Sequence, residues 1–257
     1  MPFHSYYWNE HEFASPRLQV AWQQLRVPED DEARLAAFQA LLHDESVAAQ
    51  CIALDHHAYM ESQERHGARN PFAGFADEVR KCARQRLRDD AFPGEAAGGV
   101  EPGASHASAL GALLNLAKAD DAALVARALS RTASRSVLHE GVRAARAVLG
   151  DAGNSGGPPD RSLIAALQAI VQDGEQPDDL RAAAIMAFAD CRTPDITSVL
   201  REATGLGSLR LQATAAWLLA DDLDLHRPLI ETLVASWPAD PPYPASEVIE
   251  ILKYDAD

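Results

Sequence analysis

The sequence predicts an all-α protein, built as a right-handed α-solenoid of stacked antiparallel helix pairs. Aromatic residues make up only 6% of the 257 residues and Ala dominates the apolar set, which suits thin helical layers packed through small side chains. Runs of Val, Ile, Tyr and Thr with a period of two are absent, so we expect essentially no sheet. Apolar segments with the helical period recur along the chain, and such repeats are typical of solenoids.

The clearest repeat joins residues 179–195 to residues 208–224. A shift of 29 positions aligns Leu180 with Leu209, Arg181 with Arg210, Ala184 with Ala213, Ala187 with Ala216 and Phe188 with Trp217. A third copy is GVRAARAVLGD, in which Leu149 follows Ala145 by four residues. These copies define a frame with one large apolar residue in each repeat.

Extending this frame along the chain gives seven positions. The large apolar residues are Leu25, Leu54, Leu87, Leu116, Leu149, Phe188 and Trp217. Four residues before them stand Ala21, Gln50, Ala83, Ala112, Ala145, Ala184 and Ala213, so six of the seven are Ala. A small residue one turn before a large one lets a neighbouring helix approach closely, as stacked layers require.

The remaining segments complete the helix pairs and mark the loops. Partner helices are predicted at 32–43, 120–130, 160–172, 195–203 and 225–235, with Asp160 and Asp195 as N-caps. Gly- and Pro-rich stretches predict loops at 89–105 and 150–159, and the segment 238–244 precedes a C-terminal capping helix at 245–254. The solenoid is therefore expected to span residues 16–257.

Residues 1–15 precede the first repeat and gather aromatic side chains in a chain otherwise poor in them. Tyr6, Tyr7, Trp8 and Phe13 all lie in this segment. We interpret it as an N-terminal aromatic cap over the first layer. The alternative is an exposed anchor for a partner, because aromatic residues dominate binding hot spots.

The second helices resemble the HEAT-like repeat family, in particular its bacterial short-repeat branch related to phycobilisome-lyase-type repeats. The matching residues are Val142, Arg143, Ala145, Leu149 and Gly150; Leu180, Arg181, Ala184, Ala187 and Phe188; and Leu209, Arg210, Ala213, Ala216 and Trp217. The resemblance covers roughly residues 16 to 254. It implies the fold and carries no reaction with it.

Charge and composition limit the classes of partner. The net charge of −15 repels phosphate polymers, so we expect no nucleic acid and favour a protein partner with a basic surface. Acidity of this size can also serve solubility alone. Cys51, Cys82 and Cys191 show no CxxC spacing, and neither a leader nor a membrane segment is read from the sequence. We expect a cytoplasmic protein with reduced thiols.

Candidate chemistry is sparse. His57 and Glu61 stand one turn apart in a His-rich stretch that also holds Asp55, His56 and His66, so they could face one metal ion. The simpler interpretation is that these histidines titrate in solvent, and no metal or other cofactor is predicted. Two His-Glu dyads, at 11–12 and 139–140, invite comparison with the HEAT-like deoxyhypusine hydroxylases, and the alkylpurine DNA glycosylases are another HEAT-like enzyme class. The few dyads and the lack of a basic groove argue against both.

The concave face formed by the second helices is the predicted binding surface. Its candidate residues are Gln23, His56, Lys81, Gln85, Leu110, Leu114, Arg143, Asp151, Met186, Asp190 and Gln212. An apolar groove with a polar rim suits a protein surface. If the frame is rotated by one residue, the Leu side chains belong to the core instead. The leading hypothesis is a non-enzymatic interaction module, an adaptor or an immunity-type inhibitor of a basic protein. The alternative is a HEAT-like lyase or metal-dependent hydroxylase.

Overall fold

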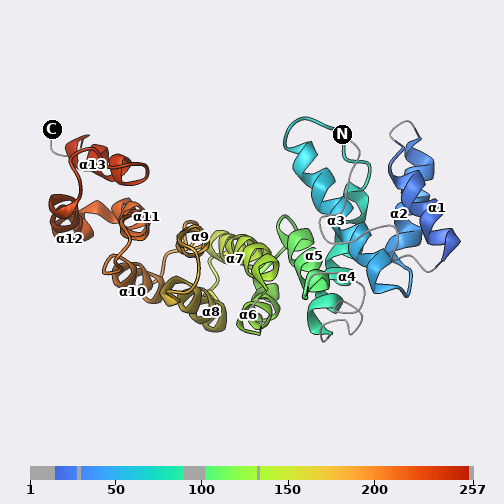
Figure 1. The fold of residues 1–257 in the computed structure, drawn as a ribbon, viewed down its shortest axis with the longest axis horizontal. Coiled ribbons are helices and arrows are strands. Elements are labelled where there is room, and N and C mark those ends of the chain that lie inside the picture. The colour runs from blue at the N-terminus through green and yellow to red at the C-terminus, as the bar shows by residue number, and fades with distance from the viewer. Residues whose placement is uncertain (1–14, 28–29, 90–101, 132–133, 255–257) are drawn as a thin grey trace. The chain divides into compact units, whose positions relative to one another are not determined.

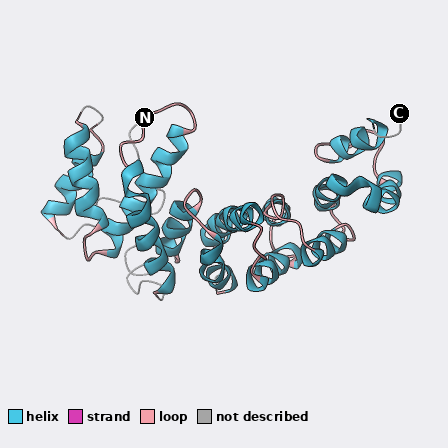
Figure 2. Cartoon of the chain, turned by 180° about the vertical axis from the view of Figure 1, so that it is seen from behind, coloured by secondary structure: helices cyan, strands magenta, loops and turns pink. Residues whose placement is uncertain are grey.

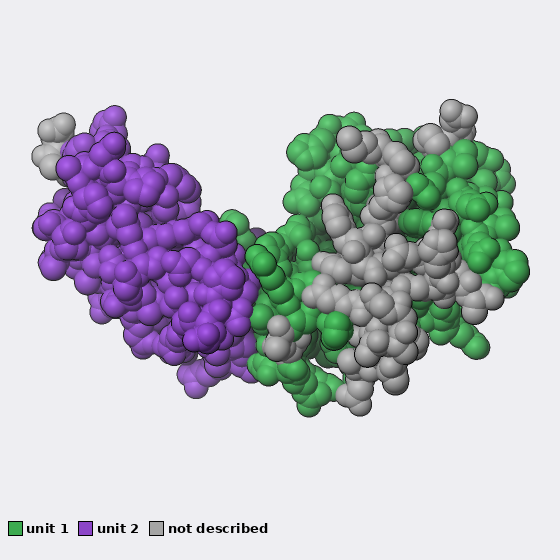
Figure 3. All heavy atoms as spheres, viewed as in Figure 1, with its two compact units in different colours: residues 1–147 green, residues 148–257 purple. Residues whose placement is uncertain are grey.

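The computed structural model describes residues 15–27, 30–89, 102–131 and 134–254. Within these ranges the chain consists of helices joined by turns and loops, without a strand (Figures 1 and 2). The predicted all-α class is therefore confirmed. The chain groups into two compact units, residues 1–147 and 148–257 (Figure 3). A single continuous solenoid over 16–257 stays a prediction, and the aromatic segment before Ser15 lies outside the described residues.

The first unit is built from consecutive helices that pack against their neighbours. They are α1 (Pro16–Leu25), α2 (Asp31–Leu42), α3 (Val47–Glu64), α4 (Ala76–Arg88), α5 (Ala104–Leu113), α6 (Ala122–Ser130) and the first part of α7 (Arg135–Ser155), with 3₁₀ turns η2 (Ala73–Phe75) and η3 (Ala119–Asp121). Helix α1 packs on α2, α2 on α3, and α5 lies against both α3 and α4. Neighbouring helices of this unit therefore pack as pairs.

The second unit repeats this arrangement. After the end of α7 come α8 (Arg161–Gln172), α9 (Asp178–Met186), α10 (Pro194–Ala203), α11 (Leu209–Leu219), η4 (Ala220–Asp222), α12 (Leu223–Ser236) and α13 (Ala245–Tyr254). Helices α9, α11 and α13 pack in a row, while α8 contacts α10. The helix predicted at 245–254 is confirmed at both ends, and it contacts α11 and α12.

The frame derived from the repeats corresponds to the core at most positions. All six Ala residues of the frame are buried, as are five of its large residues, with Leu25, Leu54 and Phe188 fully enclosed. Two large residues differ, because Leu116 and Trp217 are only half-buried. Helix α5 ends at Leu113, three residues before Leu116, so Leu113 fills the core there instead.

Helix starts follow local capping chemistry. The Asp160 side chain accepts hydrogen bonds from the backbone N–H groups of Ser162 and Leu163, which confirms its predicted N-cap role at α8. The prediction for Asp195 is wrong. Thr193 caps α10 by accepting from the Ile196 N–H at 3.3 Å, and Pro194 occupies the first helical position, where its missing N–H costs nothing.

The predicted loop at 150–159 is largely helical, because α7 continues to Ser155. A Cβ atom at Gly153 would overlap the backbone carbonyl oxygen of Asp190, so glycine is needed here for a close approach of two backbones within the second unit. Gly153, one of the glycines that indicated a loop, therefore serves helix packing. Of the loop predicted at 89–105, residues 90–101 lie outside the described residues.

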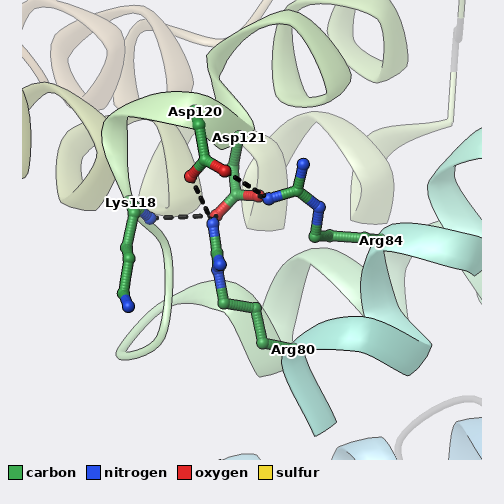
Figure 4. A network of polar contacts seen from close by, with 5 residues as sticks. All are labelled: Arg80, Arg84, Lys118, Asp120 and Asp121. Carbon is green, nitrogen blue, oxygen red and sulfur yellow. Dashed lines mark hydrogen bonds and ion pairs between the residues drawn. The ribbon is translucent and has the colours of Figure 1, made fainter. Parts of the chain in front are cut away.

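A partly buried ion-pair network joins α4 to η3 (Figure 4). Asp121 is fully enclosed and accepts hydrogen bonds from the Lys118 N–H at 2.9 Å and from the Arg80 Nε at 3.0 Å. The Arg84 Nη1 lies 2.9 Å from the other oxygen of this carboxylate and donates to Asp120 at 2.7 Å. Removing one partner of such an ion pair would leave the other charge buried without compensation. We therefore assign this network a structural role, in which it holds α4 against η3.

Candidate functional site

The first unit contains a hollow between α3, α5 and α7, which we name the α3–α5–α7 hollow. Its lining residues are Asp55, Ala58, Tyr59, Ser62, Arg65, Ala107, Gly111, Leu114, Glu140 and Arg143. Its volume is about 170 Å³, below the roughly 300 to 1,000 Å³ of typical small-molecule sites. The hollow therefore suits one long side chain better than an organic cofactor.

Small residues create the floor of the hollow. Ala58 on α3 and Ala107 and Gly111 on α5 have small side chains or none, so they leave space between the two helices. Leu114 supplies a half-buried apolar edge. A Cβ at Gly111 would lie 3.6 Å from the Glu140 carboxylate, which is ordinary contact. The glycine is thus not required for helix packing, and its effect is to leave space beside Glu140.

Charged groups surround this apolar floor. Asp55 is only 9% exposed, whereas Arg65 is open to solvent. Glu140 accepts two hydrogen bonds from the Arg143 Nη1, at 3.1 and 2.9 Å, and the Arg143 side chain is 45% exposed. The hollow therefore places two carboxylates and the Tyr59 ring next to an apolar surface.

Two adjacent histidines of α3 lie in the core next to the hollow. His56 is 2% exposed and its ring centre lies 5.1 Å from that of Phe72, while His57 is fully enclosed. Burial lowers the pKa of His57 to about 4. Burial, together with the positive charges of Arg34 and His57, lowers the pKa of His56 to about 3. The interpretation of these histidines as solvent-exposed is wrong, because the segment around Phe72 folds over this part of α3.

The His57 and Glu61 pair considered as a metal site is geometrically isolated. The His57 Nε2 lies 3.8 Å from the Glu61 Oε1, and that oxygen accepts a hydrogen bond from the Asn70 side chain at 2.7 Å. In the described ranges, no group of three or more His, Cys, Asp or Glu side chains is arranged to hold a metal ion. Glu61 has a raised pKa, first because of its partial burial and then because of Glu64.

Of the predicted binding residues, Leu114 and Arg143 line the hollow. Two others were placed on the open surface and are buried. His56 lies in the core as described, and Leu110 is fully enclosed, with its Cδ1 close to Gly141 of α7. Leu110 and Leu113 stand three residues apart, so they lie on the same face of α5, and both are fully enclosed. The alternative of a core position therefore holds for Leu110, whereas Leu114 is only half-buried.

The other predicted residues lie elsewhere. Gln23 on α1 and Lys81 and Gln85 on α4 are exposed and do not line the hollow. Asp151, Met186, Asp190 and Gln212 belong to the second unit, where Asp190 is exposed and Asp151 and Met186 are half-buried. Gln212 has a packing role, since its side chain donates to the Leu206 carbonyl at 2.6 Å and accepts from the Trp237 Nε1 at 3.1 Å.

Several lining residues were not predicted as binding residues. Asp55 and Glu140 were noted only as potential metal ligands, and Tyr59 and Gly111 carried no signal. Their common feature is position on three helices that meet in space, which spacing within one helix does not reveal. The two faint signals available were the acidic residue beside each His in the stretches around His56 and His139.

The described fold defines an all-α protein of packed neighbouring helix pairs. No family model matches the sequence, and a search of curated proteins finds no significant match. Among the described residues, no helix is both long and apolar enough to cross a membrane.

Proposed function

We propose that this chain is a protein-binding module that takes a Lys or Arg side chain from a basic segment of its partner into the α3–α5–α7 hollow. The observation that carries the proposal is an apolar floor of Ala58, Ala107 and Leu114 flanked by the carboxylates of Asp55 and Glu140. We further propose that the helix pairs form a HEAT-like α-solenoid. The row formed by α9, α11 and α13 and the packing of α8 on α10 support this fold type.

A long cationic side chain matches the hollow in two ways. Its aliphatic stem can cover the apolar floor while its charged end reaches the carboxylates. The Tyr59 ring adds a face to which a cation is attracted. Glu140 already binds Arg143, whose side chain is 45% exposed, so an incoming cation shares this carboxylate or displaces Arg143 toward solvent.

The whole chain favours the same class of partner. A net charge of −15 raises the encounter rate with a cationic protein and disfavours a competing anionic one. Charge steering and a side-chain pocket together describe an adaptor or an inhibitor of a basic protein.

The proposal is tested with a random peptide library displayed on phage and selected on the full chain at low salt. We expect selected peptides to be enriched in Lys or Arg next to apolar residues, and to bind Gly111→Leu at least tenfold more weakly in fluorescence anisotropy. The leucine side chain fills the hollow. Gly111→Ala should weaken binding less, although it favours the helix by about 0.5 to 1 kcal/mol, so any loss of binding cannot come from unfolding.

Gly74→Ala is the matched control, because no atom lies within 4 Å of the added Cβ. It should bind the selected peptides like the wild type. Enrichment of acidic peptides, or equal affinity for Gly111→Leu and the wild type, would overturn the proposed function.

A further inference from the structure

The second unit carries a separate groove between α10 and α12, which we name the α10–α12 groove. Its lining residues are Arg192, Thr193, Pro194, Thr197, Ser198, Arg201 and Leu225. Its volume is about 590 Å³. The chain has 38 acidic residues, yet none of those that the structure describes lines this groove. The groove is therefore a local exception to the acidic character of the molecule.

Arg201 supplies the charge of the groove. One of its Nη atoms lies 3.3 Å from the Nδ1 of His226, which is 4% exposed, and in the described part of the chain no carboxylate pairs with this guanidinium. Burial, followed by the charge of Arg201, lowers the pKa of His226 against the opposing effect of Asp222. A neutral imidazole can accept from Arg201, which fixes one edge of the guanidinium. Its other N–H donors make no hydrogen bond with the residues that the structure describes.

Hydroxyl groups add donors along the same helix. Thr197 and Ser198 line the groove, and their hydroxyls make no hydrogen bond within the described residues. Thr193 accepts from the Ile196 N–H, so its own O–H remains a donor. A guanidinium edge and several hydroxyl groups together offer hydrogen-bond donors. An oxyanion suits this site, because ionised carboxylates and phosphates accept hydrogen bonds from such donors.

Arg192 also lines the groove, but its role differs from that of Arg201: it shapes the side of the groove and does not bind the ligand. Its guanidinium pairs with Asp221 and donates to the backbone carbonyls of Phe188 and Leu218. Its charge is thus neutralised, and its position is fixed by three contacts. The anionic group of a ligand would be expected on Arg201.

Leu225 indicates which kind of ligand carries the anionic group. It lines the groove and is 59% exposed, whereas Ile230 of the same helix is fully enclosed. A free anion would leave this side chain in water. A protein segment with an apolar residue next to an acidic one would cover it.

We propose that the α10–α12 groove binds an acidic segment of a protein, with an Asp or Glu carboxylate on Arg201 and the hydroxyls of Thr197 and Ser198, and with a neighbouring apolar side chain on Leu225. This inference is independent of the proposed function of the α3–α5–α7 hollow, which lies in the other unit and selects the opposite charge. Because the chain as a whole repels anions, the short-range contacts on Arg201 must provide the affinity.

The test is a titration of the isotope-labelled full chain, observed by NMR, with a short peptide carrying two glutamate–leucine pairs. We expect saturable shifts at Thr197, Ser198 and the Arg201 Nε–H. Replacing the glutamates by glutamine, or the leucines by serine, should weaken binding at least fivefold. Absence of shifts in the groove, or inorganic phosphate binding as tightly as the peptide, would overturn the proposal.

Ser198→Asp is the decisive variant. It places a carboxylate three residues before Arg201 on the same helix face, where such a pair supports the helix, so the variant should fold. The new carboxylate competes with the peptide for Arg201, and we expect the dissociation constant to rise at least tenfold. Ser198→Asn should bind nearly as the wild type, and Arg161→Gln, an exposed arginine outside the groove, should not change affinity. Equal binding by Ser198→Asp and Ser198→Asn would contradict the role of Arg201.

Discussion

His56 and His57 are two neighbouring imidazoles held neutral inside an aromatic cluster. Phe38 and Phe72 pack around them, with ring centres 6.3 Å from His57 and 5.1 Å from His56 respectively. Arg34 lies over the Phe72 ring at 5.3 Å, so a positive charge already stands near this cluster. Protonation of either histidine would bury a second positive charge in this cluster, which is costly in an apolar core. The Glu61 Oε1 lies 3.8 Å from the His57 Nε2.

This arrangement predicts that the protein loses stability in mild acid. The pKa of His57 is about 4 in the folded chain and 6.5 when exposed, so between these values the unfolded chain binds more protons. The contribution of neutral His57 to the free energy of unfolding should therefore be fully present above pH 6.5 and decrease as the pH drops toward 4. At pH 5 the loss from His57 is about 2 kcal/mol. Urea unfolding at pH 7.5, 6 and 5 measures this dependence.

The variant His57→Phe isolates the effect from that of the carboxylates. A phenyl ring cannot take up a proton, so the decline between pH 6.5 and 5 should be smaller than in the wild type. His66→Phe, at an exposed position, should decline like the wild type. Equal slopes for His57→Phe and the wild type would show that His57 does not control this pH window.

At the scale of the helix, the second unit depends on small residues where layers meet. Ala184 on α9 and Ala213 on α11 are fully enclosed, and the two helices pack on each other. We expect Ala184→Leu and Ala213→Leu each to lower the free energy of unfolding by about 1 to 3 kcal/mol through overpacking. Thermal unfolding followed by circular dichroism measures this loss.

Ala169→Leu is the matched control, because Ala169 lies on the exposed face of α8. It should change the melting temperature little. If the two buried positions accepted leucine as easily as Ala169 does, the close approach of α9 and α11 would be wrong.

The sequence predicted helices best where periodicity and caps agreed. Residues 160–172 correspond to α8 at Arg161–Gln172, and 245–254 to α13. It failed where a residue served packing rather than local structure. Gly153 suggested a loop, but it allows contact with the Asp190 backbone, which is distant in sequence. Leu116 fitted the repeat spacing, yet α5 ends before it. Local patterns do not record where a helix stops for tertiary reasons.

The candidate site was predictable only in part for the same reason. Two of the predicted binding residues, Leu114 and Arg143, line the hollow, because the repeat frame gives one face of each helix. Their role in binding stays a prediction. Asp55 and Tyr59 required knowledge of which turn of α3 faces α5 and α7. His56 was misplaced because the segment that covers it, around Phe72, has no repeat signature.

At the scale of the whole molecule, negative charge exceeds positive charge by 15. Many basic groups are already in ion pairs, including Arg80 with Asp121 and Arg192 with Asp221. The uncompensated carboxylates repel one another in the compact state, which destabilises the fold at low salt. Salt screens this repulsion, and it also screens the exposed ion pairs, each of which contributes only about 0 to 1 kcal/mol.

Because the excess charge is large and the exposed pairs are weak, we expect repulsion to dominate. Raising NaCl from about 20 to 200 mM at pH 7.5 shortens the screening length to roughly 7 Å and should raise the melting temperature by about 2 to 4 °C, equivalent to ~1 kcal/mol. Scanning calorimetry measures the shift. A double variant, Glu45→Gln with Asp240→Asn, removes two exposed carboxylates and should melt higher at low salt with a smaller salt effect. A melting temperature that fell with salt would show instead that ion pairs such as the network around Asp121 outweigh the repulsion across the chain.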